Sequence, residues 1–481
     1  MGGALGEAGQ DFQFERHSSF DALALAQARA GSIEWRQMPS HSGCKLREDA
    51  HLNRQLQIGL AGIALVVGGL ALSGQLISIG SKNAAATSSS AYAALAKVST
   101  TDRRDIDYAA FDQRLQRMIE QPSMVGMAVG IVENGRITFV KGYGETISGS
   151  GDPVTPMTVF RWASVSKGVA GTMAAKLAEM GKLDLNAPIA NYSSTLKLPG
   201  GAEYRATLGD VLSHRLGLYR NAYDDKLEAG EDPRFIRQAL GTLASLCAPG
   251  TCWSYQNIAF DAASEAVAKA MGKPYQEAVP DLLFKPLGMA SASVTRAGLE
   301  GSPSWARPHA AGRRELPMSD AYYRVPAAGG INSNIKDMSL WMIAQMGGMP
   351  DILDKKLLDE IHAPLVSTPG ERGRLRKFLE RLKDPYYGYG WRSYAYAGHH
   401  IVGHRGGVDG YRSLILFDPM LKSGVVALWN SSTSQPAGLE FEVMDMLYKL
   451  DFRDWMELNQ KSAIPVVETL EDRQSGDPAR R

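Results

Sequence analysis

A serine and a lysine stand three residues apart where a helix is expected to begin. Residues 161–171 read RWASVSKGVAG, and an alanine-rich run follows. Residues at this spacing share one face of a helix, so the amine of Lys167 would reach the hydroxyl of Ser164. A serine hydroxyl is a weak nucleophile that needs a neighbouring base, and a lysine amine removed from water loses proton affinity and can act as one. The pair therefore indicates covalent catalysis, although an exposed helical serine and lysine would show the same spacing.

A tyrosine and an asparagine follow in a loop before a later helix. The stretch PGTCWSYQN holds Tyr255 and Asn257. The phenol of Tyr255, held as a phenolate by a neighbouring lysine, could take a proton from Ser164 and later activate water. The amide of Asn257 can donate to a substrate carbonyl and accept from a substrate N–H. We predict a catalytic role for Tyr255, for which the alternative is an aromatic ring that only packs.

The stretch GHRGG places His404, Arg405 and Gly406 at the start or end of a late strand. A histidine here would carry a charge that depends on pH. His400 lies four residues before His404, a spacing that can bind a metal, but no carboxylate is close in sequence, and we predict no metal site. Arg405 could pair with a substrate carboxylate, or it could point to solvent because alternate residues of a strand face opposite sides.

Taken in order, Ser-x-x-Lys, Tyr-x-Asn and His-x-Gly resemble the three motifs of the serine β-lactamase and penicillin-binding-protein family. The resemblance is greatest to its class C-like branch, which includes class C β-lactamases, D-Ala-D-Ala carboxypeptidases, D-aminopeptidases and family VIII esterases. Further stretches agree, among them LDLNAPIANY, LGDVLSHRLGL, FKPLGM and YGYGW. The resemblance covers residues 106–450.

This resemblance implies an acyl-enzyme mechanism and no cofactor. It implies catalysis by Ser164, Lys167 and Tyr255; substrate binding by Asn257, His404, Arg405 and Gly406; and an oxyanion hole made by the backbone N–H groups of Ser164 and Gly407. The family often has lysine where this chain has His404, and β-lactamases usually have threonine or serine where it has Arg405. These departures weaken the case for efficient β-lactam hydrolysis. We expect His214, in an apolar helical stretch, to be structural.

We therefore predict a serine hydrolase that acts on a β-lactam, a D-amino-acid peptide or a small ester. One alternative is a non-catalytic, membrane-tethered protein that binds cell-wall peptide or an acylated ligand. Another is an unrelated membrane protein in which the Ser-x-x-Lys spacing is coincidental. The three motifs together favour the hydrolase.

Hydrophobic patterning predicts an α+β domain over residues 106–455. Strand-like runs at 124–132 and 136–143 flank Asn134-Gly135, which is a strong hairpin signal. Strand character returns only near the end of the domain, so we expect an antiparallel sheet built from both ends, with a helical lobe between them. A cleft between the two lobes would hold the site. The expected helices cover residues 106–118, 166–180, 208–218, 258–272 and 441–450.

The 22 residues 58–79 form an apolar run without charge. A run of about 20 such residues can cross a bilayer, so we predict a transmembrane or signal-anchor helix. Basic residues are more frequent before it, which places residues 1–57 in the cytoplasm and the domain in the periplasm or another extracytoplasmic space. Residues 1–57 could also be a misassigned leader, with the true start at Met38. Residues 80–105 read as a linker that offers signal-cleavage sites, and residues 456–481 as a polar tail.

Composition and cysteines add two expectations. The 481 residues are 44% hydrophobic with a formal net charge of +1, so nothing indicates a nucleic-acid partner. Cys247 and Cys252 flank a Pro-Gly turn and could form a local disulfide in an oxidising compartment, or could remain two unpaired thiols. The sequence does not predict an oligomeric state.

Overall fold

The computed structural model describes residues 93–103 and 105–459. The apolar segment 58–79 that we predict to enter the membrane lies outside these residues. Within the described part of the chain, no helix is both long and apolar enough to span a bilayer.

An antiparallel sheet of eight strands forms the centre of the domain, in the order β2-β1-β10-β9-β8-β7-β6-β5. The strands are β1 (Gly126–Glu133), β2 (Arg136–Gly144), β5 (Val366–Ser367), β6 (Leu382–Tyr387), β7 (Arg392–Tyr396), β8 (His399–Val408), β9 (Tyr411–Asp418) and β10 (Ser423–Trp429). The first strand pairs with the last, with Met127 opposite Trp429. The expectation of a sheet built from both ends of the domain is therefore confirmed.

The turn between β1 and β2 explains why these strands pair as a hairpin. Asn134 and Gly135 both take positive φ angles, of 51° and 73°. Two consecutive residues in this region match the right-handed twist of the strands, and asparagine and glycine tolerate it best. The predicted hairpin is confirmed.

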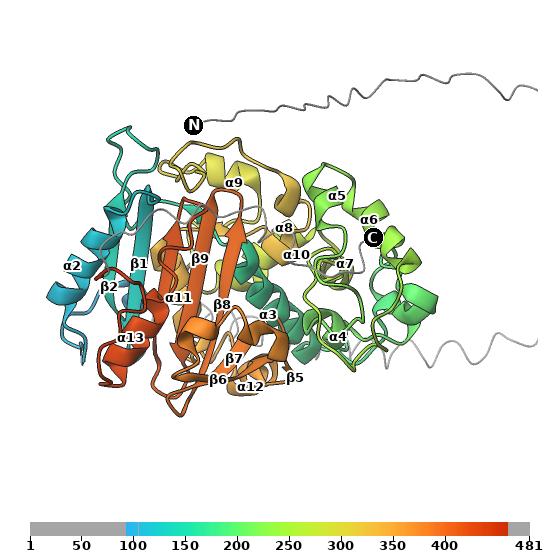
Figure 1. The fold of residues 1–481 in the computed structure, drawn as a ribbon. Helices are drawn as coiled ribbons and strands as arrows, with labels where there is room; N and C mark the ends of the chain where they lie inside the picture. Colours follow the sequence, from blue (N-terminus) through green and yellow to red (C-terminus); the bar gives the residue numbers. More distant parts are fainter. Residues whose placement is uncertain (1–92, 104, 460–481) are drawn as a thin grey trace, which may run out of the picture. The chain divides into compact units, whose positions relative to one another are not determined.

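Both faces of the sheet are covered, which is why β1 and β10 are buried along their whole length. Met127, Val129 and Ile131 pack toward α2 (Tyr108–Ile119) and α13 (Leu439–Leu447). The alternate residues Ala128 and Val132 join the larger core on the other side. That side is covered by α3 (Ser166–Glu179) and α11 (Ile335–Gln345) (Figure 1).

A mostly helical region lies between β2 and β5 in the chain. Its other regular elements are β3 (Phe160–Arg161), α4 (Leu208–Leu212), α5 (Asp224–Glu228), α6 (Pro233–Ala239), α7 (Ala262–Met271), α8 (Tyr275–Val279), α9 (Arg296–Glu300), α10 (Pro326–Gly329), β4 (Asn332–Ser333) and α12 (Lys355–His362). Helix α3 packs against α7 and α10, and the turn at residues 163–165 that precedes it contacts β8 and β9, so this segment joins the region to the sheet (Figure 1).

Two helices are shorter than we predicted. Helix α4 ends at Leu212 because His214 takes a positive φ of 59° and turns the chain. Helix α7 begins only at Ala262, after hydrogen-bonded turns over residues 258–261. In both cases apolar residues beyond the helix are buried by tertiary contacts, so their periodicity extends past the helical backbone.

Candidate active site

Ser164 lies in a short 3-10 turn, η2 (Ala163–Val165), immediately before α3. Across residues 158–175, all of which the structure describes, Ser164 is the one residue that is not buried. The preceding Ala163 takes a positive φ of 48°, which costs a non-glycine residue of the order of 1 kcal/mol. Strained backbone of this kind is typical of functional sites, and here it exposes the serine at the start of a buried helix.

Lys167 is fully buried and holds three polar partners. Its Nζ lies 2.6 Å from Asn257 Oδ1, 2.9 Å from the carbonyl oxygen of Ala328 and 3.4 Å from Ser164 Oγ. The first two partners can only accept hydrogen bonds. A neutral amine would donate both of its protons to them and aim its lone pair at the serine hydroxyl, so the arrangement suits a base.

A buried carboxylate, that of Asp261, fixes the backbone next to the carbonyl that contacts Lys167. Asp261 accepts from the backbone N–H of Ala327, at 2.9 Å, and pairs with the guanidinium of Arg237 at 2.9 Å. Burial raises the pKa of Asp261 to about 7, while the charge of Arg237 and the hydrogen bond to Ala327 oppose the rise. Asp261 therefore fixes α10, which carries Ala328.

Tyr255 lies beside the lysine. The Nζ of Lys167 is 4.7 Å from the centre of the Tyr255 ring and 5.3 Å from that of Phe260. Tyr255 is 7% exposed and contacts the ring of His214 at 4.4 Å between centroids. The structure thus brings the first two motifs, 90 residues apart in sequence, around one amine.

Backbone hydrogen bonds hold the loop that carries Tyr255 and Asn257. Its N–H groups at Leu246, Gly250 and Ser254 donate to the carbonyls of Gly217, Arg215 and His214. In the opposite direction, the N–H of Asn221 donates to the carbonyl of Tyr255 at 2.8 Å. The two segments therefore run side by side, which fixes the position of the second motif.

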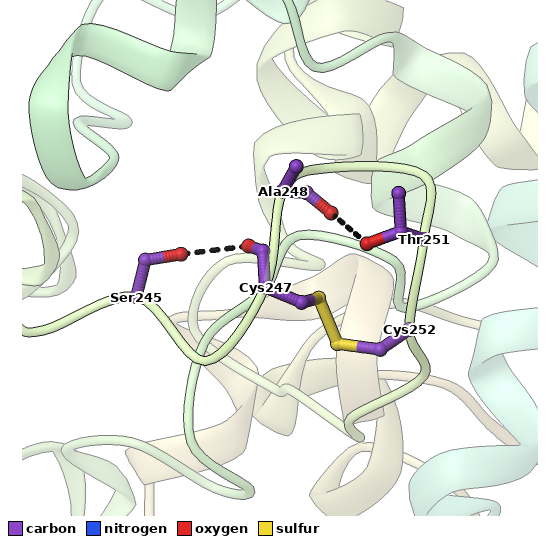
Figure 2. Close-up of a disulfide and its surroundings, with 5 residues drawn as sticks. All are labelled: Ser245, Cys247, Ala248, Thr251 and Cys252. Carbon is purple, nitrogen blue, oxygen red and sulfur yellow. Dashed lines mark hydrogen bonds between the residues drawn. A yellow bond between two sulfur atoms is a disulfide. The ribbon is translucent and has the colours of Figure 1, made fainter.

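A disulfide closes the start of this loop. The structure joins Cys247 to Cys252 (Figure 2). Hydrogen bonds from Ser245 Oγ to the Cys247 carbonyl and from Thr251 Oγ1 to the Ala248 carbonyl, both 2.7 Å, brace the same turn. Because the bridge ends three residues before Tyr255, it supports the second motif directly.

Reduction of this disulfide should lower stability modestly. A loop this short restrains the unfolded chain by only about 2 kcal/mol, so the free energy of unfolding should fall by at most that amount. Urea unfolding with and without a phosphine reductant measures the change. A Cys247→Ser/Cys252→Ser variant serves as control, because its unfolding should not respond to reductant. An unchanged wild-type midpoint would contradict the structural role of the bridge.

His404 is buried within a chain of hydrogen bonds. The backbone N–H of Gln256 donates to His214 Nδ1 at 3.2 Å, so the other ring nitrogen of His214 carries the proton and donates to Tyr387 Oη at 3.2 Å. The Tyr387 hydroxyl then donates to His404 Nε2 at 3.0 Å, and His404 Nδ1 donates to the carbonyl of Arg405 at 2.7 Å. Every member is satisfied when both histidines are neutral.

Burial also keeps these histidines uncharged. It lowers the pKa of His404 well below its ordinary value, and the nearby charges of Arg392 and Lys167 lower it further. Burial and the charge of Lys167 act in the same direction on His214. The structure therefore places His404 near the site as a neutral ring with both nitrogens occupied, and His214 becomes part of the packing around Tyr255.

Arg405 does not reach the site, which corrects its predicted place among the substrate-binding residues. Its guanidinium pairs with Glu440 on α13 and lies over the rings of Phe378 and Phe441. Successive residues of a strand point to opposite faces of the sheet. His404 and Gly406 face η2, and Arg405 between them therefore faces α13.

Gly406 lies directly against the backbone before the serine. A Cβ at this position would come within 2.3 Å of the Trp162 carbonyl oxygen and 3.0 Å of Ser164 N. Ser413, its partner on β9, donates to the same Trp162 oxygen at 2.5 Å. The neighbouring Gly407 is exposed. This close approach sets the end of β8 beside the backbone N–H of Ser164, where an oxyanion hole between Ser164 and Gly407 is expected.

Two arginines and a glutamate near Tyr255 escaped prediction from the sequence. Glu371 accepts from Arg220 at 2.8 Å and pairs with Arg392 at 3.2 Å. Both guanidinium groups lie within 5.9 Å of the centres of the Trp253 and Tyr255 rings. Burial would raise the pKa of Glu371, but the charges of Arg392 and Arg220 outweigh it and lower the pKa. These residues come from three segments that are far apart in sequence, so no local sequence motif predicts that they cluster.

Asp224 is a further residue that sequence reasoning missed. Its Oδ2 accepts from Asn257 Nδ2 at 2.7 Å. It begins helix α5, which carries none of the three sequence motifs. Among the described residues, no group of three or more histidines, cysteines, aspartates or glutamates is arranged to hold a metal ion.

Comparison with known proteins agrees with this fold. A family model described as Beta-lactamase matches residues 111–445, well over half of the chain. The chain therefore belongs to the Beta-lactamase family. Its fold is similar to that of the octameric penicillin-binding protein homologue from Pyrococcus abyssi, with a TM-score of 0.65 and 22% identity over 73% of this chain and 80% of that one.

Two curated relatives carry names that describe activities. The Unguisins hydrolase ungD′ of Aspergillus campestris is 26% identical over 69% of this chain and 63% of its own length. The D-alanyl-D-alanine-carboxypeptidase/endopeptidase AmpH of Escherichia coli is 28% identical over 45% of this chain and 56% of its own length. The chain thus matches less than two thirds of each of these relatives.

Proposed function

We propose that this protein is a serine hydrolase that works through an acyl-enzyme on Ser164. The observation that carries the proposal is the buried amine of Lys167, which has two carbonyl acceptors and lies 3.4 Å from Ser164 Oγ. That geometry lets the amine accept the serine proton without rearranging its other two hydrogen bonds. The family membership and the relatives named as hydrolase and carboxypeptidase support the same reaction class.

In the acylation step, Lys167 takes the hydroxyl proton while Ser164 Oγ attacks the substrate carbonyl. The oxygen that becomes negative is held by the backbone N–H groups of Ser164 and Gly407, each worth about 3 kcal/mol in the transition state. The leaving group then departs with the proton that Lys167 received. Tyr255, acting as a phenolate, takes a proton from the water that attacks the acyl-enzyme. As the acid leaves, Tyr255 returns that proton to Ser164 Oγ, which restores both the phenolate and the serine hydroxyl.

The substrate that we propose is a peptide ending in a D-amino acid, with small esters also accepted. Neutral His404 and outward-facing Arg405 leave the third motif without a fixed cation, so neither a β-lactam carboxylate nor the terminal carboxylate of a peptide would be held there. Arg220 is partly exposed, pairs with Glu371 and lies 5.5 Å from the centre of the Tyr255 ring, and it is the cation that would instead hold the carboxylate of the peptide. The name of the carboxypeptidase relative supports a D-alanyl peptide.

A comparison of three substrates tests the proposed substrate class. The full chain is assayed with a D-Ala-D-Ala peptide, p-nitrophenyl butyrate and the chromogenic cephalosporin nitrocefin. We expect turnover of the peptide and the ester, and a kcat/KM for nitrocefin about 10- to 150-fold lower than for the peptide, because one missing charged hydrogen bond costs about 1.5–3 kcal/mol. Fast nitrocefin hydrolysis would contradict the proposed substrate class. Binding of all three without any turnover would favour a non-catalytic binder.

We also propose that the domain works in an extracytoplasmic, oxidising compartment, tethered by the apolar segment 58–79. The disulfide between Cys247 and Cys252 supports an oxidising environment. A carboxy-terminal alkaline phosphatase fusion, which is active only outside the cytoplasm, tests the location. Fractionation of the same fusion tests the tether, and an inactive, soluble fusion would overturn both.

A further inference from the structure

A line of hydrogen bonds continues from the nucleophile to a carboxylate that takes no part in the steps above. Lys167 joins Ser164 to Asn257, and Asn257 Nδ2 donates to Asp224 Oδ2 at 2.7 Å. Lys167 donates to Asn257 at 2.6 Å, so Asn257 turns its oxygen toward Lys167. Its NH2 group then faces Asp224, whose carboxylate is the acceptor that completes this orientation.

The hydrogen bond from Asn257 uses only one of the two carboxylate oxygens of Asp224. Its second oxygen, Oδ1, is buried without a hydrogen-bond partner among the described residues. The positive charge that faces it belongs to Lys167 on α3, and the like charges on its own helix α5 are Asp225 and Glu228. The phenol of Tyr322, on the neighbouring segment, faces it as well and donates to Glu228 at 3.1 Å.

We infer that Asp224 is a positioning residue that acts through Asn257. It fixes the orientation of the Asn257 amide, and its negative charge stabilises the ammonium that forms on Lys167 when Ser164 loses its proton. The inference rests on the proposed function and deepens it. Behind the nucleophile Ser164 the hydrogen bonds therefore connect a base, Lys167, an amide, Asn257, and a carboxylate, Asp224. Other nucleophile and base pairs are likewise oriented by a third group.

The ionisation of this carboxyl gives the inference a signature in pH. Burial raises the pKa of Asp224 to about 7, although the hydrogen bond from Asn257 and the charge of Lys167 lower it. The carboxylate is therefore lost as the pH falls through about 7, and the stabilisation of the ammonium is lost with it. Acylation should decline on the acidic side of pH 7.

The experiment compares Asp224→Asn with Asp225→Asn, an exposed neighbour on the same helix turn. Hydrolysis of p-nitrophenyl butyrate is measured from pH 5 to 9, together with the rate of labelling by a fluorophosphonate. We expect Asp224→Asn to lower kcat by about 10- to 100-fold with KM within about threefold, and to abolish the decline near pH 7. Asp225→Asn should keep both the rate and the decline.

Several results would overturn the inference. An Asp224→Asn variant with kcat within twofold of wild type, or with the decline near pH 7 intact, contradicts it. A wild-type profile without any ionisation near 7 contradicts it even where the variant fails to fold. If the wild-type chain takes no label at all, the proposed function fails and the inference fails with it. If wild type and Asp224→Asn are labelled at equal rates, only the inference is contradicted.

Discussion

Replacing Lys167 by methionine is expected to lower kcat/KM by at least about 10³-fold while the chain still folds. Methionine has a similar length but can neither accept the proton of Ser164 nor donate to Asn257 Oδ1. The effect should fall on acylation, because the amine lies 3.4 Å from the serine oxygen. Steady-state kinetics on p-nitrophenyl butyrate, with circular dichroism to verify the fold, measure it.

A matched control lies on the same helix. Lys176 pairs with Glu179 near the surface, one of the ordinary ion pairs that contribute little. Lys176→Met makes the same chemical change away from Ser164 and should leave kcat/KM within about twofold, as expected for a surface substitution. If Lys167→Met kept more than a tenth of the wild-type activity, Lys167 would not be the base.

Replacing Gly406 by alanine should lower kcat/KM by about 100-fold or more, because losing one oxyanion donor costs that much. The added Cβ would lie 2.3 Å from the Trp162 carbonyl oxygen, so β8 must move away from η2. That movement separates the backbone N–H groups of Ser164 and Gly407. Forcing a methyl group into a packed site also costs about 1–3 kcal/mol of stability, so the midpoint of thermal unfolding should fall.

A second glycine on the same strand separates these two effects. A Cβ on Gly403 would lie 2.3 Å from the Ile415 carbonyl oxygen, an equally tight contact that does not involve η2. Gly403→Ala should therefore lose similar stability but keep kcat at temperatures where it is folded. Equal loss of kcat in both variants would show that crowding of β8, and not its place beside Ser164, accounts for the effect.

The sequence could predict those parts of the site whose residues lie close together in the chain. Ser164 lies in the turn that leads directly into the helix of Lys167, and Tyr255 and Asn257 share one loop, so their spacing carries information. Their convergence needed the family resemblance, because nothing in either stretch specifies the other. The antiparallel sheet was predictable because its strands alternate or are continuously apolar and because Asn134-Gly135 marks a turn.

The parts that the sequence could not predict depend on strand orientation and on distant partners. Arg405 lies next to His404, but only the fold decides which of the two faces the site and which pairs with Glu440. The protonation of His404 depends on Tyr387, whose hydroxyl is supplied by another strand. Asp224 gains its role from Asn257, 33 residues away in sequence.

The central claim, an acyl-enzyme on Ser164, is tested most directly by mass spectrometry of the labelled protein. The full chain is incubated with a fluorophosphonate and then digested. We predict one adduct, on the peptide that contains Ser164. It should be absent from Ser164→Ala and retained in Ser166→Ala, because the hydroxyl of Ser166 is buried and accepts from the backbone N–H of Ile331. An adduct on another residue, or one that persists in Ser164→Ala, would contradict the account.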